Sequence, residues 1–293
     1  MDRVIALGTF DGVHLGHRKL IDTALELAKK QGARPMIYTF SNHPGEVFGP
    51  KPSLLMMGKD RIAVLSALCE TATDPFDKAY AAMEPIAFVK MLIERFSMKT
   101  VVGGFNYTFG SRGAGNMALL KTLGAEMGFA VCEIPPLTYE GDPISSTRIR
   151  IAIEAGDVKS AEAMLGRPFT LTGRVEPGKA IGHSLGFPTA NLCPDEELAL
   201  PATGVYATWA VLPDGIRRPS VTNVGYNPTI GNDKITVETH ILDTCDDLYG
   251  QEMKVAFSRR MREDRCFHSR EELAAQIGRD VNEARMLLAK AGG

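Results

Sequence analysis

The segment Gly8-Thr9-Phe10-Asp11-Gly12-Val13-His14-Leu15-Gly16-His17 joins a short apolar run, residues 4–10, to a helical pattern over residues 15–30. An apolar run that stops at Asp-Gly is typical of a buried strand ending in a turn. Gly32 follows the helical pattern, at the position where a glycine commonly ends a helix. A strand, a glycine-rich turn and a helix in this order predict the first unit of a parallel sheet covered by helices.

The same segment offers groups that suit a phosphate. A helix N-terminus presents unpaired N–H groups and a partial positive charge. His14 and His17 share a helix face, and Gly16 between them would let a phosphate approach the backbone. Both histidines can donate hydrogen bonds as charge develops on a polyphosphate. We predict His14 and His17 as catalytic residues; the predicted nucleotide-binding residues of this segment are Gly8, Phe10, Gly12 and Gly16. A surface histidine pair is the alternative, and the lack of G-K-[ST] excludes a Walker A loop.

A second anion site is predicted at Ser145-Ser146-Thr147-Arg148. Serine and threonine are favoured at the N-terminus of a helix, where their hydroxyl groups and the free N–H groups point outward. The guanidinium of Arg148 would add a forked donor for phosphate. We predict Ser146 and Thr147 as nucleotide-binding residues and Arg148 as a catalytic residue. By itself such a segment is more often only a helix cap.

Two domains are predicted, residues 1–167 and 168–293. Before Gly166-Arg167-Pro168, strand-like and helix-like segments alternate, which indicates a parallel α/β sheet. The predicted strands there are 36–40, 100–102 and 130–134, and the predicted helices are 61–68, 86–96, 117–127 and 146–165, the last with a possible break at Gly156-Asp157. Afterwards, strand-like runs follow one another until a helix at 269–290; the runs are 169–175, 205–212, 219–224, 235–242 and 252–257. Serial strands separated by turns predict an antiparallel sheet or small barrel with one C-terminal helix.

The second half contains a loop rich in glycine, residues 178–191, with side chains suited to a metal and a phosphate. Thr189 and Asn191 offer the hard oxygen ligands that Mg²⁺ prefers. The predicted nucleotide-binding residues of this loop are Gly178, Lys179, Gly182 and Gly186, since glycines allow a backbone to approach phosphate closely. Glu238 lies in a strand-like run on the same face as His240 and is our candidate general base for an alcohol. A structural turn and a solvent-exposed glutamate are the alternatives.

Composition limits the class of protein. The chain has 293 residues, 33 Lys and Arg against 35 Asp and Glu, and a formal net charge of −2, which gives no general attraction to nucleic acid or to an anionic membrane. Five widely spaced cysteines without a C-x-x-C pair argue against a disulfide framework and a structural zinc site. We predict neither a membrane-spanning helix nor a signal peptide, a cytoplasmic location, small-molecule partners only, and a monomer or weak homo-oligomer.

The pattern G-x-F-D-G-x-H-x-G-H, with S-S-T-x-x-R at 145–150, resembles the nucleotidyltransferase superfamily. Together with Thr39-Phe40-Ser41-Asn42-His43-Pro44 and residues 104–110, the first half looks like the adenylyltransferase module of bacterial bifunctional riboflavin kinase/FAD synthetases. The string G-F-P-T-A-N-L at 186–192 resembles the riboflavin kinase signature of the same family. That resemblance continues at 222–225, 227–229, 237–243 and 247–250.

The resemblance implies an α/β chain with a Rossmann-like nucleotidyltransferase domain and a six-stranded antiparallel barrel kinase domain. It implies ATP, riboflavin and FMN as substrates, Mg²⁺ with ATP, and flavin as substrate and product. Glu238 falls at the family's base position, and the flavin-binding positions carried over are Asn106, Thr108, Phe109 and Arg262. His183 replaces an arginine common in relatives, and Asp264 replaces the usual glutamate. The alternatives are a nucleotidyltransferase for another phosphate acceptor, such as phosphopantetheine or glycerol phosphate, and a flavin-binding regulatory or storage protein without catalysis.

Overall fold

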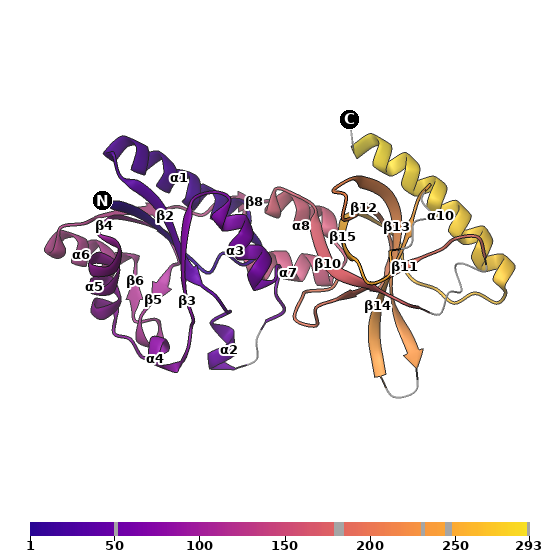
Figure 1. Cartoon of the computed structure of the whole chain (residues 1–293), viewed down its shortest axis with the longest axis horizontal. Helices are drawn as coiled ribbons and strands as arrows, with labels where there is room; N and C mark the ends of the chain where they lie inside the picture. The colour runs from indigo at the N-terminus through magenta and orange to yellow at the C-terminus, as the bar shows by residue number, and fades with distance from the viewer. Residues whose placement is uncertain (50–51, 179–184, 230–231, 244–247, 292–293) are drawn as a thin grey trace. The chain divides into compact units, whose positions relative to one another are not determined.

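The computed structural model describes residues 1–49, 52–178, 185–229, 232–243 and 248–291 (Figure 1). Contacts between Cα atoms divide the chain into two compact units, Met1–Ser146 and Thr147–Gly293, called here the first and the second unit. Each unit has its own sheet. Among the described residues, no helix combines the length and the apolar character that a membrane span requires.

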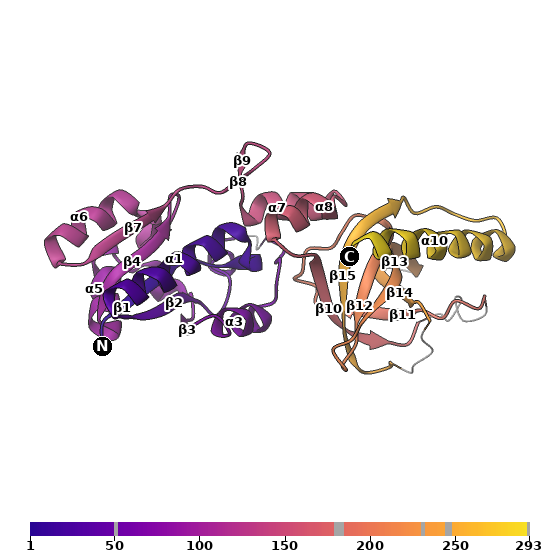
Figure 2. The ribbon, with the colours of Figure 1, turned by 90° about the horizontal axis from the view of Figure 1, so that it is seen from above.

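A five-stranded parallel sheet forms the centre of the first unit, in the order β3-β2-β1-β4-β7. Alternate residues of β1 face opposite sides, as expected for a strand buried on both faces. Ile5 and Leu7 pack against α5 and α6, whereas Val4 and Ala6 pack against α1 and α3. Figures 1 and 2 show these helices beside the sheet. The strands are β1 (Arg3–Leu7), β2 (Arg34–Phe40), β3 (Glu70–Asp74), β4 (Met98–Gly104) and β7 (Ala130–Ile134).

Helices and short hairpins connect these strands. The helices are α1 (Leu15–Gln31), α2 (Gly45–Phe48), α3 (Gly58–Ser66), α4 (Lys78–Ala81), α5 (Pro85–Phe96) and α6 (Met117–Met127), with 3₁₀ turns η1 (Asp11–Val13) and η2 (Ser111–Gly113). Two hairpins are formed by β5 (Thr108–Phe109) with β6 (Gly115–Asn116) and by β8 (Thr138–Tyr139) with β9 (Asp142–Pro143). The predicted glycine at the end of α1 is confirmed: Gly32 has φ 63°, and its N–H bonds the carbonyl of Ala28.

The second unit is a closed antiparallel barrel in the order β10-β11-β14-β13-β12-β15. Its strands are β10 (Phe169–Glu176), β11 (Ala190–Pro194), β12 (Gly204–Val211), β13 (Arg217–Thr229), β14 (Asn232–Ile241) and β15 (Glu252–Arg262). Helix α10 (Arg270–Ala291) lies along the barrel (Figure 2). Its Ala284 and Leu288 pack against Val205, Ala207 and Val221. The predicted parallel sheet, six-stranded barrel and C-terminal helix are therefore confirmed.

The segment between the two sheets is a pair of helices, α7 (Ser146–Glu154) and α8 (Val158–Leu165), rather than one continuous helix. The break falls at Gly156, whose φ of 78° is left-handed and whose missing side chain leaves room for Tyr206 and Arg260. Helix α8 packs against β10 and β15, and the second unit begins at Thr147, the second residue of α7.

Candidate active sites

The turn after β1 holds its backbone in unusual conformations. Phe10, Gly12 and Val13 have φ angles of 54°, 76° and 41°. For residues with a Cβ, this left-handed region costs energy and persists only where surrounding contacts enforce it. Phe10 is completely buried, and the buried carboxylate of Asp11 accepts a hydrogen bond from the N–H of Leu55 at 3.0 Å. The turn is therefore fixed from the core side before any ligand binds.

His14 begins α1 and orients the second histidine. Its Nδ1 accepts a hydrogen bond from the N–H of His17 at 3.3 Å, so a neutral His14 carries its proton on Nε2. Gly16 leaves room for this ring, because a Cβ there would come within 3.1 Å of it. The structure thus adds a role for Gly16 beyond the predicted approach of phosphate to the backbone.

His17 is held in its neutral form. Burial, followed by the nearby positive charges of His14 and Arg61, lowers its pKa well below the ordinary value of 6.5. Its Nδ1 is buried, and no described residue forms a hydrogen bond with it. The edge of the Phe10 ring contacts the His17 ring, with centroids 5.2 Å apart. A buried, unpartnered ring nitrogen beside the start of a helix is suited to an incoming polar group.

Arg61 is a component that the sequence did not indicate. Its guanidinium is buried and donates to the carbonyl oxygens of Thr9 at 2.8 Å and Phe40 at 2.7 Å, and to the hydroxyl of Thr39 at 2.9 Å. Thr9 lies just after β1, and Thr39 and Phe40 are the last two residues of the neighbouring strand β2. Arg61 therefore fixes the carboxyl ends of two strands in the sheet, the edge at which ligands bind in such folds. An arginine inside a short helical pattern gives no sequence signal for this role.

A cavity of about 650 Å³ opens at this edge of the first unit. Gly8 and Thr9 line it together with Asn106, Thr108 and Phe109, three of the predicted flavin-binding residues. Its walls are largely aromatic and apolar, formed by Phe40, Phe76, Tyr80, Met83, Phe88 and Tyr107. A cavity of this size with flat apolar walls suits an aromatic ligand of the size of a nucleotide or a flavin.

The predicted second anion site starts where expected, since α7 begins at Ser146. The Ser146 hydroxyl donates to the carbonyl oxygen of Asp11 at 2.9 Å, which ties it to the turn that precedes His14. Thr147 and Arg148 follow in α7 and open the second unit. A shared action of Arg148 with the histidines stays a prediction.

The barrel places two of the predicted kinase residues side by side. Asn191 on β11 and Asn223 on β13 are both paired with Glu238 on β14, one on each side. Directly paired residues of adjacent strands share a face of the sheet. Val237 and Thr239 point into the barrel and are buried, as the predicted alternation requires, whereas Glu238 is half-buried. The side chain of Asn223 was not singled out by the sequence analysis, although the motif containing it was.

Thr189 directly follows two residues that contact a side chain of the barrel strand β14. The carbonyl oxygen of Pro188 is 2.8 Å from Nδ1 of His240, two residues after Glu238 on the same strand face. The Phe187 ring meets the His240 ring edge to face, with centroids 5.5 Å apart. His240 therefore fixes the residues immediately before Thr189.

Glycines complete the loop of the second site. A Cβ on Gly178 would overlap the amide group of Asn191, and Gly186 has a left-handed φ of 82°. Only glycine avoids both penalties at these positions. The predicted nucleotide-binding residues Lys179 and Gly182, together with His183, lie outside the described residues.

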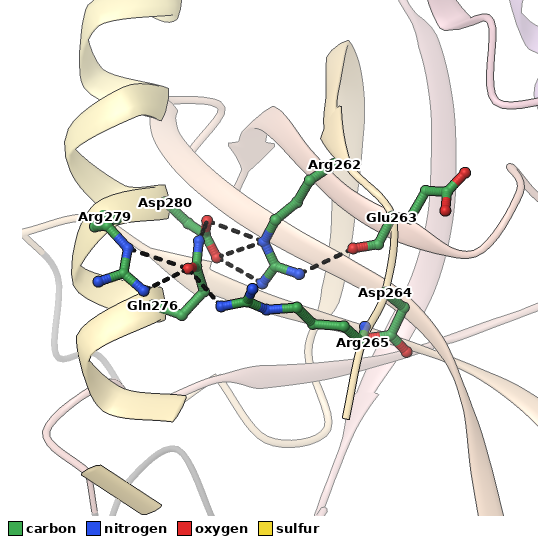
Figure 3. Close-up of polar contacts among 7 residues, drawn as sticks. All are labelled: Arg262, Glu263, Asp264, Arg265, Gln276, Arg279 and Asp280. Carbon is green, nitrogen blue, oxygen red and sulfur yellow. Dashed lines mark hydrogen bonds and ion pairs between the residues drawn. The ribbon is translucent and has the colours of Figure 1, made fainter. Parts of the chain in front are cut away.

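Arg262 is already engaged within the second unit (Figure 3). Its Nε and Nη2 donate to the buried carboxylate of Asp280 in α10, with Nη2 to Oδ2 at 2.8 Å, and its Nη1 donates to the carbonyl of Glu263 at 2.9 Å. Gln276 adds a hydrogen bond to Asp280 at 2.7 Å and accepts from Arg265 at 2.8 Å. The structure thus gives Arg262 the role of joining β15 to α10, and its predicted flavin contact stays a prediction.

Sequence comparisons define the class of protein. The protein family described as FAD synthetase matches residues 1–148, and the family described as riboflavin kinase matches residues 165–288. The chain is thus a two-part flavin-processing transferase, in which the parallel sheet and the barrel carry different activities.

Curated relatives cover the two parts together. A bifunctional riboflavin kinase/FMN adenylyltransferase of Bacillus subtilis is 35% identical, over 96% of this chain and 91% of the relative. One from Escherichia coli K12 is 33% identical over the same shares. The chain belongs to the bifunctional riboflavin kinase/FMN adenylyltransferase family. A crystal structure titled as a macrolide-efflux protein from Streptococcus pneumoniae has the same fold, with a TM-score of 0.89, 31% identity and coverage of 97% of this chain and 94% of that one.

Proposed function

We propose that the first unit, with the start of α7, transfers the adenylyl group of ATP to FMN. An oxygen of the FMN phosphate attacks the α-phosphorus of ATP, a P–O bond forms, and pyrophosphate leaves as the bond to the β-phosphate breaks. A phosphate dianion is itself a nucleophile, so the protein needs no base for this step. The observation that carries the proposal is that Gly8 and Thr9 line the same cavity as Asn106, Thr108 and Phe109.

The two histidines would act as hydrogen-bond donors to the nucleotide phosphates, with His17 in its neutral form. His14 presents Nε2–H because its Nδ1 is occupied by the N–H of His17. His17 is kept neutral by burial and adjacent positive charge. Donors that are fixed before the reaction stabilise charge developing in the transition state without reorganising. Gly8, Phe10, Gly12 and Gly16 would shape the backbone around the phosphates, with Ser146, Thr147 and Arg148 as the proposed second group.

We propose that the second unit phosphorylates riboflavin. The ribityl 5′-hydroxyl attacks the γ-phosphorus of ATP, and ADP leaves. Glu238 orients the hydroxyl and takes its proton, which is the usual role of a carboxylate in phosphoryl transfer to an alcohol. The placement of Glu238 between Asn191 and Asn223 in the barrel ladder supports this assignment.

Thr189 and Asn191 suit the Mg²⁺ that accompanies ATP. Both provide neutral oxygen ligands, and the absence of a side chain at Gly178 leaves the space that the Asn191 amide occupies. When bound there, Mg²⁺ would neutralise charge on the nucleotide phosphates. Contacts within the protein position these two side chains. The His240 ring fixes the backbone before Thr189, and strand pairing fixes Asn191 beside Glu238.

The test is to incubate the purified protein with riboflavin, Mg²⁺ and ATP and to separate the flavins by chromatography over time. FMN should form first and FAD should follow. Flavin retained without consumption of ATP would instead identify a storage or regulatory protein. FAD formation from added FMN, with neither FMN nor FAD formed from riboflavin, would contradict the kinase half. The functional boundary at residue 167 and a cytoplasmic location remain predictions from the sequence.

A further inference from the structure

The cavity of the first unit contains one charged side chain among the described residues that line it. The lining is otherwise aliphatic, aromatic, glycine or neutral polar, and Arg112 is the exception. A ligand held by these walls would meet a single positive charge. The cavity therefore matches a molecule that is flat and apolar over most of its surface and carries one anionic group.

Arg112 is not engaged by the protein. No described residue forms a hydrogen bond or an ion pair with its guanidinium, and its side chain is exposed to solvent. Two other arginines of the same unit do have side-chain partners: Arg61 donates to two carbonyl oxygens and a hydroxyl, and Arg95 pairs with Asp74 at 2.6 Å. The donors of Arg112 are thus available to a ligand.

The hairpin that carries Arg112 holds it in place. Its base is the β5–β6 pair, with Thr108 opposite Asn116, and the N–H of Ser111 donates to the carbonyl of Met83 at 2.7 Å. Gly110 fits tightly against Pro85, where a Cβ would come within 2.7 Å. Arg112 follows with a left-handed φ of 54° and ψ of 23°.

This conformation favours glycine, and a side chain there is a cost to the fold. Backbone strain of this kind is concentrated at sites where a side chain must be presented to a ligand. Arg112 thus occupies a backbone conformation that glycine would adopt more readily.

We propose that Arg112 binds the phosphate of FMN and gives the first unit its preference for FMN over riboflavin. This assignment rests on the proposed adenylyl transfer to FMN. The two flavins differ only in the phosphate, and a guanidinium forms forked, charge-assisted hydrogen bonds to phosphate. Riboflavin fits the same aromatic walls but leaves Arg112 without its partner. Because the Arg112 side chain is exposed, water solvates it when riboflavin is bound, so the discrimination comes from the charge-assisted hydrogen bonds that only the FMN phosphate can form.

The experiment measures FAD formation from FMN and ATP at varied FMN concentration for Arg112→Gln, Arg112→Lys and Arg112→Gly. The KM for FMN should rise roughly 10- to 100-fold in Arg112→Gln, the factor that corresponds to a lost charge-assisted hydrogen bond. The rise should be smaller in Arg112→Lys, which keeps the charge, and kcat should change less than KM. Arg112→Gly removes the charge and relieves the backbone strain together, so its rise in KM cannot come from unfolding. Lys90→Gln removes an exposed positive charge on α5 outside the cavity lining and should match the wild type.

Inhibition by lumiflavin, a flavin without ribityl chain or phosphate, separates phosphate from ring recognition. Its inhibition constant should be the same in the wild type and in Arg112→Gln. An unchanged KM for FMN in Arg112→Gln and Arg112→Gly would overturn the proposal, and so would a parallel weakening of lumiflavin inhibition. A wild-type protein that forms no FAD from FMN and ATP would overturn the proposed function itself, and the assignment of Arg112 with it.

Discussion

The imidazole rings of His14 and His17 are stacked, with centroids 3.6 Å apart and planes inclined by 17°. Two protonated rings at this distance would repel each other, which is one reason why the pKa of His17 is lowered. The stack also fixes both rings at the start of α1. Two fixed donors at a helix N-terminus, with His17 held neutral, form a site suited to anionic phosphate.

Replacement of His17 by alanine should reduce FAD formation from FMN by about 10²–10³-fold, the usual loss for one donor to developing charge. Phosphorylation of riboflavin should be unchanged, because His17 lies in the first unit and Glu238 in the second. The two reactions are to be assayed separately, with FMN and with riboflavin as the starting flavin. His268→Ala, at an exposed histidine, is the matched control. Loss of both activities in a folded His17→Ala protein would contradict the division of labour.

The lowered pKa of His17 makes stability depend on pH. Below about pH 6.5 the unfolded chain binds a proton at His17 that the folded chain does not bind, so the free energy of unfolding falls as the pH falls. One such group contributes at most about 1.4 kcal/mol per pH unit. Denaturant unfolding of the wild type and of His17→Gln between about pH 7.5 and 5.5 should show a shallower slope in the variant. Equal slopes in the wild type and in His17→Gln would exclude this effect.

Glu238→Gln should produce the opposite pattern to His17→Ala. Loss of a general base reduces such reactions by about 10²–10⁴-fold, so FMN formation from riboflavin should fall by this order. FAD formation from added FMN should continue. Glu283→Gln, at an exposed position of α10, controls for the loss of a carboxylate. A variant that phosphorylates riboflavin at the wild-type rate would show that another group takes the proton.

Gly178→Ala tests the close packing of Gly178 against the Asn191 amide in the second site, without removing any polar group. The added Cβ would overlap the Asn191 amide, which must then leave its position on the strand residue paired with Glu238. A displacement of about 1 Å in a positioned group can reduce a rate about 10²-fold, so riboflavin phosphorylation should fall to that extent while FAD formation is retained. Gly278→Ala in α10 is the control, because the nearest heavy atom to its Cβ would be 4.0 Å away. Equal kinase rates in the two variants would contradict the packing argument.

The sequence predicted what depends on short-range patterns. The turn at 8–17 was identified from its glycines and histidines, and the face of Glu238 followed from the alternation of β14, which the burial of Val237 and Thr239 confirms. Strand β3 was missed because Glu70-Thr71-Ala72-Thr73-Asp74 has no apolar alternation, and it lies at the edge of the sheet, where fewer side chains are buried.

Long-range partners could not be predicted in the same way. Arg61 bonds Thr9 across 52 residues, and Asp280 bonds Arg262 from another element. Neither pair has a local signal, since the partners meet only after the sheet and the barrel have closed. For the same reason, the family resemblance assigned Arg262 to flavin without indicating its carboxylate partner.

Asp280→Ala should destabilise the second unit through Arg262. Asp280 is buried and receives two donors of the guanidinium, whereas the Arg262 side chain is 22% exposed, so part of the lost interaction is replaced by water. We expect the free energy of unfolding to fall by about 1–3 kcal/mol. Arg279→Ala, which removes an exposed contact to Gln276 in the same network (Figure 3), should change it by no more than about 0.5 kcal/mol. Because Arg262 and Asp280 act as one unit, the double variant Arg262→Ala/Asp280→Ala should lose less than the sum of the single losses. Additive losses would show that the two side chains stabilise the barrel and α10 independently.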